Sequence, residues 1–244
     1  MSVPTALSRP ERVVPREERR RPPEPAALTA SQRSALHAAA LHEAGHLPPA
    51  LSRADQVGLA ALGLVDDLPV LPEAERVAVH SRAPRCRITA AGRSRALQEP
   101  PARLWVVPCS AAKRDVAAAP AGEMYTGSYH LAARRAALAC ASDSSELIVL
   151  SAKFGLVRLD DHILHYNLKA GSKGTVTGEV LRRQAHYLAL SGAAVTVLAG
   201  KAYAELAREV WPGLHHPVAD ARGIGDHLAH FADLYAPDRH RMRT

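Results

Sequence analysis

The stretch Leu-Ile-Val-Leu-Ser-Ala-Lys-Phe-Gly at residues 147–155 decides the fold, because a short, wholly apolar run passes directly into a polar turn. Similar apolar runs of strand length occur at Leu104–Val107 and Ala194–Ala199. Helical patterns separate and follow these runs, near Glu123–Ala141, Val176–Leu190 and Ala202–Val210. Apolar strands that alternate with amphipathic helices are typical of a parallel sheet covered on both faces. The sequence therefore predicts a three-layer, mostly parallel α/β domain over residues 102–238.

The prolines of Glu99-Pro100-Pro101 mark the expected boundary between this domain and a smaller unit, residues 28–99. In the smaller unit, Thr29 and Ser52 are expected to cap two helices, and Thr89 a third. Short segments at 64–65, 77–79 and 87–88 are expected to form strands. This order of elements resembles a winged helix. The alternative is a small helical unit that packs on the α/β domain and touches no DNA.

Residues 1–27 alternate arginine and glutamate among prolines at positions 4, 10, 15, 22, 23 and 25. Such a segment buries too little apolar surface to offset its ordering entropy, so we expect a disordered tail. The formal net charge of the chain is +7, and much of it lies in this tail and in Arg239, Arg241 and Arg243. Basic surface attracts phosphate without regard to sequence, which favours a DNA or RNA partner. The alternative is that the charged tails are simply solvated.

Composition disfavours membrane and secreted classes of protein. No window holds ~18 uninterrupted apolar residues, the length that a membrane span requires, and no apolar stretch follows the N-terminal charges as in a secretory signal. The cysteines Cys86, Cys109 and Cys140 are odd in number and lack paired ligand spacing, which argues against a disulfide framework and a cysteine zinc site. We therefore expect a cytoplasmic protein with no membrane partner and no metal. The sequence identifies no cofactor.

Small residues and lysines follow each predicted strand. The three turns contain Ser110 and Lys113, then Ser151, Lys153 and Gly155, then Gly200 and Lys201. In an open α/β sheet, ligands bind beyond the carboxyl ends of the strands. Small residues there expose backbone donors and lysines supply charge, so the turns predict a site for an anionic small molecule. Gly223 and Gly225, before the last helix, either add backbone donors to this site or form a plain loop.

Cys109 is the candidate nucleophile, because it directly follows a predicted strand. Lys113 is close enough in sequence to favour the thiolate, and His130 is the candidate base. The alternative is that Cys109 only packs at the strand end, since free cysteines are often buried. The catalytic interpretation requires further side chains to converge on the same cleft, those of Tyr125, Ser128 and Ser151.

The segment Leu150–Gly171 resembles the signature of the YaaA-type peroxide-stress family. That signature runs Leu-Ser-Gly-x-Tyr-Gly-Val-Leu, then Pro-Leu-Asp, then Pro-Tyr-Arg-Leu-x-Met-Gly. The matching residues here are Leu150–Val157, Leu159-Asp160 and Tyr166–Gly171, and the family's Tyr-Thr-Gly is matched by Tyr125–Gly127. The resemblance implies a nucleic-acid-binding protein that acts in an oxidative-stress context.

A partial likeness connects the same region to archaeosine synthase, whose core motif runs Pro-Cys-x-x-x-Lys-Pro-Tyr-x-x-Ser-x-x-His. Pro108, Cys109 and Lys113 match its first part, and a second group matches its remainder after a long insertion, namely Tyr125, Ser128 and His130. The complete Pro-Cys-Ser-x-x-Lys…Tyr-Thr-Gly-Ser-Tyr-His arrangement also resembles an uncharacterised actinobacterial domain family. The likeness to the synthase implies chemistry on a modified nucleobase.

Two further motifs have the wrong context. His42-Glu43-Ala44-Gly45-His46 matches the zincin pattern, but Gly45 and Pro48-Pro49 are expected to end the helix that the pattern requires. Ser110-Ala111-Ala112-Lys113 matches the Ser-x-x-Lys of acyl-transferring serine enzymes, but their companion motifs do not occur.

Together these patterns predict a nucleic-acid-associated protein with a nucleotide- or nucleobase-handling α/β domain. The domain would act as a base-modifying transferase or hydrolase through Cys109 and Lys113, and DNA contacts would come from Arg53, Arg82, Arg85 and Arg87. The competing interpretation is a non-enzymatic DNA-binding or stress-response protein whose pocket only senses a ligand.

Overall fold

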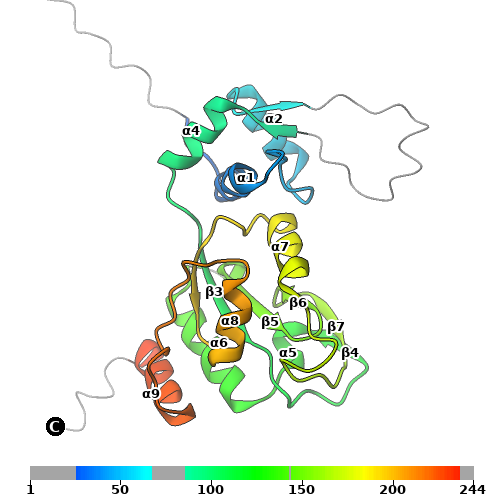
Figure 1. Cartoon of the computed structure of the whole chain (residues 1–244), viewed down its shortest axis with the longest axis vertical. Coiled ribbons are helices and arrows are strands. Elements are labelled where there is room, and N and C mark those ends of the chain that lie inside the picture. The colour runs from blue at the N-terminus through cyan, green and yellow to red at the C-terminus, as the bar shows by residue number, and fades with distance from the viewer. Residues whose placement is uncertain (1–25, 68–85, 143, 237–244) are drawn as a thin grey trace, which may run out of the picture.

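The computed structural model describes residues 26–67, 86–142 and 144–236, which form an N-terminal unit and a C-terminal domain joined by a linker after Gln98 (Figure 1). The N-terminal unit contains helices α1 (Ala30–Leu41), α2 (Arg53–Ala61) and α4 (Ala90–Gln98), and strands β1 (Val65–Asp67) and β2 (Cys86–Ile88). The two strands pair antiparallel. Buried leucines, among them Leu36 and Leu59, form a core of this unit that is separate from the core of the C-terminal domain.

The C-terminal domain is built on a four-stranded sheet with the strand order β6-β5-β3-β8. Its strands are β3 (Arg103–Pro108), β5 (Leu147–Ser151), β6 (Gly155–Val157) and β8 (Ala194–Val197). β3 pairs parallel with both β5 and β8, so that Val106 lies opposite Ile148 on one side and Val197 on the other. β6 is an antiparallel edge strand. The predicted α/β class with a mostly parallel sheet is therefore confirmed.

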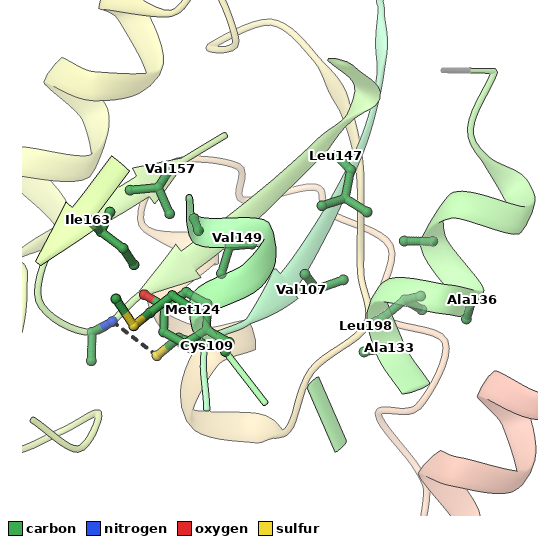
Figure 2. Packing of buried hydrophobic residues seen from close by; sticks show 14 of the residues in the cluster. Val107, Cys109, Met124, Ala133, Ala136, Leu147, Val149, Val157, Ile163 and Leu198 are labelled. Atoms are coloured by element: carbon green, nitrogen blue, oxygen red, sulfur yellow. Dashed lines mark hydrogen bonds between the residues drawn. The ribbon is translucent and has the colours of Figure 1, made fainter. Parts of the chain in front are cut away.

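Successive residues of the central strands point to opposite faces of the sheet and pack in separate cores. The helices of the domain are α5 (Ala121–Met124), α6 (Ser128–Cys140), α7 (Gly178–Tyr187), α8 (Lys201–Arg208) and α9 (Ile224–Tyr235). Val107 and Val149 pack against α5, α6 and α9, and Figure 2 shows Val107 on the side of Ala133 of α6 and Val149 near Met124 of α5. Val106 and Leu150 pack instead against α7 and α8. Helices thus cover both faces, which gives the three layers that the sequence predicted.

Short elements complete the domain. β4 (Ala118–Pro120) and β7 (His162–Leu164) form a small antiparallel sheet, and a 3₁₀ turn, η1 (Ser144–Glu146), leads into β5. Over the described ranges, no helix has both the length and the apolar character needed to cross a membrane.

In the described residues of the N-terminal unit, the elements follow in the order helix, helix, strand, strand, helix, at the places where the sequence predicted three helices and the first and last of three strands. Thr29 begins α1 with a capping box to Gln32, but the helix ends at Leu41 and does not reach Glu43. It ends there because His42 takes an extended conformation and Gly45 turns the chain with a φ of +67°. The strand expected at 77–79 and the tail up to residue 25 lie outside the described residues, and the assignment as a winged helix stays a prediction.

Candidate functional site

The parallel strands bring the three predicted turns to one edge of the sheet. β3 ends at Pro108 and β5 at Ser151, while β8 leads through Ala199 to Gly200. The ladder continues one step past the assigned pairing, because the N–H of Cys109 donates to the carbonyl of Leu150 at 3.1 Å. Cys109 and the Ser151 turn therefore lie side by side at the carboxyl edge, as the sequence predicted.

Cys109 lies at the base of this edge and is 8% exposed. Its Sγ lies 3.0 Å from the hydroxyl oxygen of Tyr203 and accepts the N–H of Ala152 at 3.5 Å. Figure 2 shows the sulfur beside Met124, joined by a dashed line to that backbone nitrogen. Cys109 is therefore both packed and hydrogen-bonded, and its contact with Tyr203 ties the first turn of α8 to the end of β3.

Two further tyrosines extend the network beside Cys109. Tyr166 Oη lies 2.9 Å from Ser151 Oγ and 3.1 Å from Tyr125 Oη. Ser151 Oγ also accepts the N–H groups of Phe154 and Lys153, at 3.0 and 3.3 Å, which fixes the turn after β5. Burial raises the pKa of Tyr125 to about 12. Burial and the neighbouring Cys109 also raise the pKa of Tyr166. Both phenols are therefore neutral at physiological pH.

Lys113 and Lys153, here called the lysine pair, lie around the ring of Tyr166. Lys113 Nζ is 4.2 Å from the centre of that ring, and Lys153 Nζ is 5.8 Å from it. Lys113 Nζ also donates to the carbonyls of Ser110 and Ala111, at 2.9 and 3.3 Å. Burial lowers the pKa of Lys113, and the neighbouring Cys109 opposes this effect. No salt bridge within residues 26–67, 86–142 and 144–236 joins either lysine to a carboxylate.

The structure places His130, the predicted base, inside the domain. This residue lies in the first turn of α6 and is fully buried. Its Nδ1 donates to the carbonyl of Pro108 at 2.7 Å, while its buried Nε2 has no hydrogen-bond partner among the described residues. Burial lowers its pKa, which keeps the ring neutral. The bond to Pro108 ties His130 to the end of β3, and its role as a base stays a prediction.

The turn after Cys109 is held against the start of α6. Ser110 Oγ accepts the N–H of Gly127 at 3.2 Å and donates to the carbonyl of Ala112 at 2.5 Å. A Cβ on Gly127 would lie 2.7 Å from Ser110 Cβ, so glycine permits this close approach. Ser128, the first residue of α6, is exposed and does not join the Cys109 network. Ser110 therefore positions the turn, and Ser128 lies on its outer rim.

Gly155 was predicted to bind a ligand, but the structure gives it a packing reason. Its φ is +76°, and a Cβ there would lie 2.0 Å from Gln184 Oε1. The side-chain amide of Gln184 accepts the N–H of Leu156 at 2.9 Å and donates to the carbonyl of Phe154 at 2.8 Å. Gln184 thus pairs with the outer edge of the sheet in the manner of a further strand, and only glycine leaves it room.

Three helices begin at glycines without a side-chain cap. Gly127, Gly200 and Gly223 precede α6, α8 and α9, whereas Thr or Ser side chains cap α1, α2, α4 and α7. A Cβ on Gly200, Gly223 or Gly225 would meet nothing within 4 Å, and none of the three has a positive φ. Tyr129 Oη lies 2.5 Å from His227 Nδ1, which joins the starts of α6 and α9. No side chain caps these three helix ends in the described part of the chain.

Lys201 does not belong to the lysine pair. Its side chain is 87% exposed, and its Nζ lies 3.8 Å from Glu205 one turn further along α8. This lysine follows a strand end, but the helix carries it outward. Of the three strand-end lysines, Lys113 and Lys153 lie around one ring and Lys201 does not join them. An anion cradle at the pair stays a prediction.

Among the residues predicted to contact DNA, Arg53 at the start of α2 and Arg87 in β2 are exposed. Arg82 and Arg85 lie outside the described residues. The zincin-like motif is not helical, because α1 ends before it at Leu41. The rings of His42 and His46 stack with centroids 5.2 Å apart. Across the described part of the chain, no group of three or more His, Cys, Asp or Glu residues is placed to hold a metal.

Sequence reasoning missed Tyr203 and Gln184 and left Tyr166 out of the site. Tyr166 begins the segment Tyr166–Gly171, which matches part of the YaaA-type signature. That match was a signal by which Tyr166 could have been assigned to the site. Tyr203 is the third residue of a helix that begins at a strand end, a position whose side chain can reach back over the sheet edge. Nothing local marks Gln184, since its role depends on the edge strand that it meets.

These features define a class: a three-layer α/β domain whose carboxyl edge carries a buried cysteine–tyrosine–serine network beside two lysines. The chain belongs to the family described as a family of unknown function (DUF6884), whose model matches residues 104–233. The match covers both lysines and every residue of the network. Neither the curated proteins nor the solved structures contain a match to the chain.

Proposed function

We propose that the C-terminal domain binds a small anionic ligand of the nucleotide class at the carboxyl edge of its sheet, where the lysine pair holds the negative charge. The observation that carries this proposal is the approach of Lys113 and Lys153 to the single ring of Tyr166, with no carboxylate partner in the described chain. The two neighbouring ammonium groups repel each other. The tyrosines are neutral, so a tyrosine offsets the positive charge of the lysines only through the weak attraction of its ring face. A bound anion would offset it directly.

The open helix ends support the same proposal. α6 starts beside Ser110, and α8 starts within one turn of Tyr203, so both N-termini lie near Cys109. Unpaired N–H groups and the helix dipole favour negative charge at such ends. Neither backbone conformation nor packing explains glycine at Gly200, and close approach of a ligand would. The resemblances to the YaaA-type family and to archaeosine synthase favour a nucleotide or nucleobase over other anions.

A second candidate function is covalent chemistry on the bound base. Cys109 Sγ accepts the N–H of Ala152, lies 3.0 Å from the Tyr203 hydroxyl and is close to Lys113. The thiolate is the nucleophilic form of cysteine, and Cys109 would attack the bound base in that form. The domain would then be a nucleobase- or nucleotide-modifying transferase or hydrolase. In the binding-only alternative, the same pocket senses its ligand and Cys109 stays unmodified.

The N-terminal unit completes the proposal as the part that contacts nucleic acid in the cytoplasm. Arg53 and Arg87 are exposed on it, and the net charge of the chain is +7. Phosphate contacts of this kind give affinity without sequence preference.

Native mass spectrometry of the protein as purified tests the ligand proposal. We expect a fraction of the chain to carry a bound molecule that contains phosphate, and denaturation should release it for identification. The Lys113→Ala/Lys153→Ala double variant should lose that molecule, while Lys201→Ala, which alters a lysine outside the pair, should retain it. A co-purified molecule that is neutral, or one that the double variant retains, would refute the proposal.

A further inference from the structure

Three histidines meet where the N-terminal unit contacts the C-terminal domain. His42 is the residue that ends α1, and its ring lies 4.4 Å, centroid to centroid, from that of His186 on α7. The ring of His46 stacks on that of His42, with the centroids 5.2 Å apart. Figure 1 shows α1 and α7 facing each other between the two parts of the chain. The histidine stack of His42, His46 and His186 therefore bridges the two parts.

The packing around the stack is close at one point and open at another. A Cβ on Gly192, which follows α7, would lie 2.5 Å from His37 Cβ in α1, so the two parts touch there. Beside this contact lies a cleft of about 860 Å³, whose lining includes His42, His186 and Trp211. The junction thus combines a small direct contact with solvent-accessible space next to the imidazoles.

The charged groups around the stack are mostly positive. From the N-terminal unit, Arg87 of β2 acts on His46, and the guanidinium of Arg93 of α4 lies close to Gly45. From the C-terminal domain, Arg182 of α7 lines the cleft. Two carboxylates are near: Glu43 lines the cleft, and Glu209 pairs with Arg182 at 3.3 Å. An added proton on an imidazole would therefore meet two other imidazoles and several arginines.

We propose that the histidine stack is a pH-sensitive joint, which holds the N-terminal unit against α7 while its imidazoles are neutral and releases it when they are protonated. Neutral rings of His42 and His186 contact each other across the junction at an interplanar angle of 34°, whereas imidazolium ions repel one another at this separation. The joint therefore controls the position of the N-terminal unit relative to α7. The proposal is independent of what the carboxyl edge of the sheet binds.

The direction of the pH effect follows from the protons that each state binds. Burial, and then the charges of His42 and His46, lower the pKa of His186 from 6.5 to about 4 in the docked state. Burial, His42 and Arg87 also lower the pKa of His46. The separated state therefore binds more protons, so docking is complete above pH 6.5 and weakens as the pH falls from 6.5 toward 4. After allowance for solvent screening, we expect the docking equilibrium to shift on the order of tenfold by about pH 5.

Small-angle X-ray scattering of the full chain at neutral pH and at about pH 5 tests the joint, with far-ultraviolet circular dichroism to show that both parts stay folded. The radius of gyration should rise at the lower pH in the wild type. The His42→Asn/His186→Asn variant, which cannot be protonated there, should keep its neutral-pH radius. His162→Asn, a change of an exposed histidine on β7, should behave as the wild type.

A permanent charge supplies the complementary test, because it does not depend on acid. His186→Lys should expand the chain at neutral pH already. Equal radii of the wild type at both pH values, or expansion of the double Asn variant as large as that of the wild type, would overturn the proposal. A pH effect that disappears in a chelator would also overturn it, because a metal ion would then hold the junction.

Discussion

The hydroxyl oxygen of Tyr203 lies 3.0 Å from Cys109 Sγ, although the two residues are 94 positions apart in the chain. The contact exists because β8 pairs directly with β3, so the helix that follows β8 starts beside the residue that follows β3. Parallel pairing thus converts two distant strand ends into one local environment. The thiol at this position has the phenol of Tyr203 as a hydrogen-bonding neighbour, which the sequence did not predict.

Thiol alkylation probes this environment. Burial raises the pKa of Cys140 at the end of α6, which keeps it in the unreactive thiol form at neutral pH. Cys109 lies near Lys113, and its Sγ accepts the N–H of Ala152. In the folded protein we expect iodoacetamide to label Cys109 several-fold faster than Cys140, measured by mass spectrometry of the peptides. Lys113→Ala should slow the labelling of Cys109 alone. Equal and slow labelling of both cysteines would exclude the nucleophile hypothesis.

Gly155 provides a test of the fold around the site. Gly155→Ala places a Cβ 2.0 Å from Gln184 Oε1 and forces a φ of +76° on an L side chain. We expect a loss of about 1–3 kcal/mol in the free energy of unfolding, measured by urea denaturation. Gly200→Ala is the matched control, since a Cβ there meets nothing within 4 Å. A Gly155→Ala protein as stable as the wild type would show that Gln184 is free to move aside.

The sheet, its layers and the convergence of the first two strand-end turns could be predicted from the sequence, because apolar runs and the helices between them determine how parallel strands pack. The role of Lys201 could not, since its distance from the lysine pair depends on the rotation of α8 at the edge. Gln184 could not either, because its amide pairs with β6, a strand that only the three-dimensional structure brings to α7. Local patterns carry no information on such long-range polar contacts.

Ligand binding should depend on pH through Lys113. Burial lowers the pKa of this lysine below the ordinary value of 10.5, so its positive charge is lost earlier than usual as the pH rises. Anion affinity should therefore fall with rising pH, starting below the range in which an exposed lysine titrates. Titration calorimetry across alkaline pH measures this fall. Lys113→Arg supplies the control, because the guanidinium stays charged throughout that range and the early fall should be absent.

Nucleic-acid binding by the N-terminal unit is separable from attraction by the tail. A chain that begins at Ala27 lacks the arginines of residues 1–26 and keeps Arg53 and Arg87. We expect it to bind duplex DNA more weakly, with log K falling by about 0.9 per phosphate contact for each tenfold rise in salt. Arg53→Glu should weaken it further, as fluorescence anisotropy would show. If removal of the tail abolishes binding, the N-terminal unit is a packing module and not a DNA reader.

Titration calorimetry with adenosine diphosphate, at fixed ionic strength and neutral pH, addresses the lysine pair itself. The wild type should bind, and Lys113→Met and Lys153→Met should each lower the affinity about tenfold, since a charge-assisted hydrogen bond contributes about 1.5–3 kcal/mol. Lys201→Met should leave the affinity unchanged, because that lysine pairs with Glu205 away from the pair. A double Lys113→Met/Lys153→Met variant that binds as tightly as the wild type would contradict the assignment of an anion site to the lysine pair.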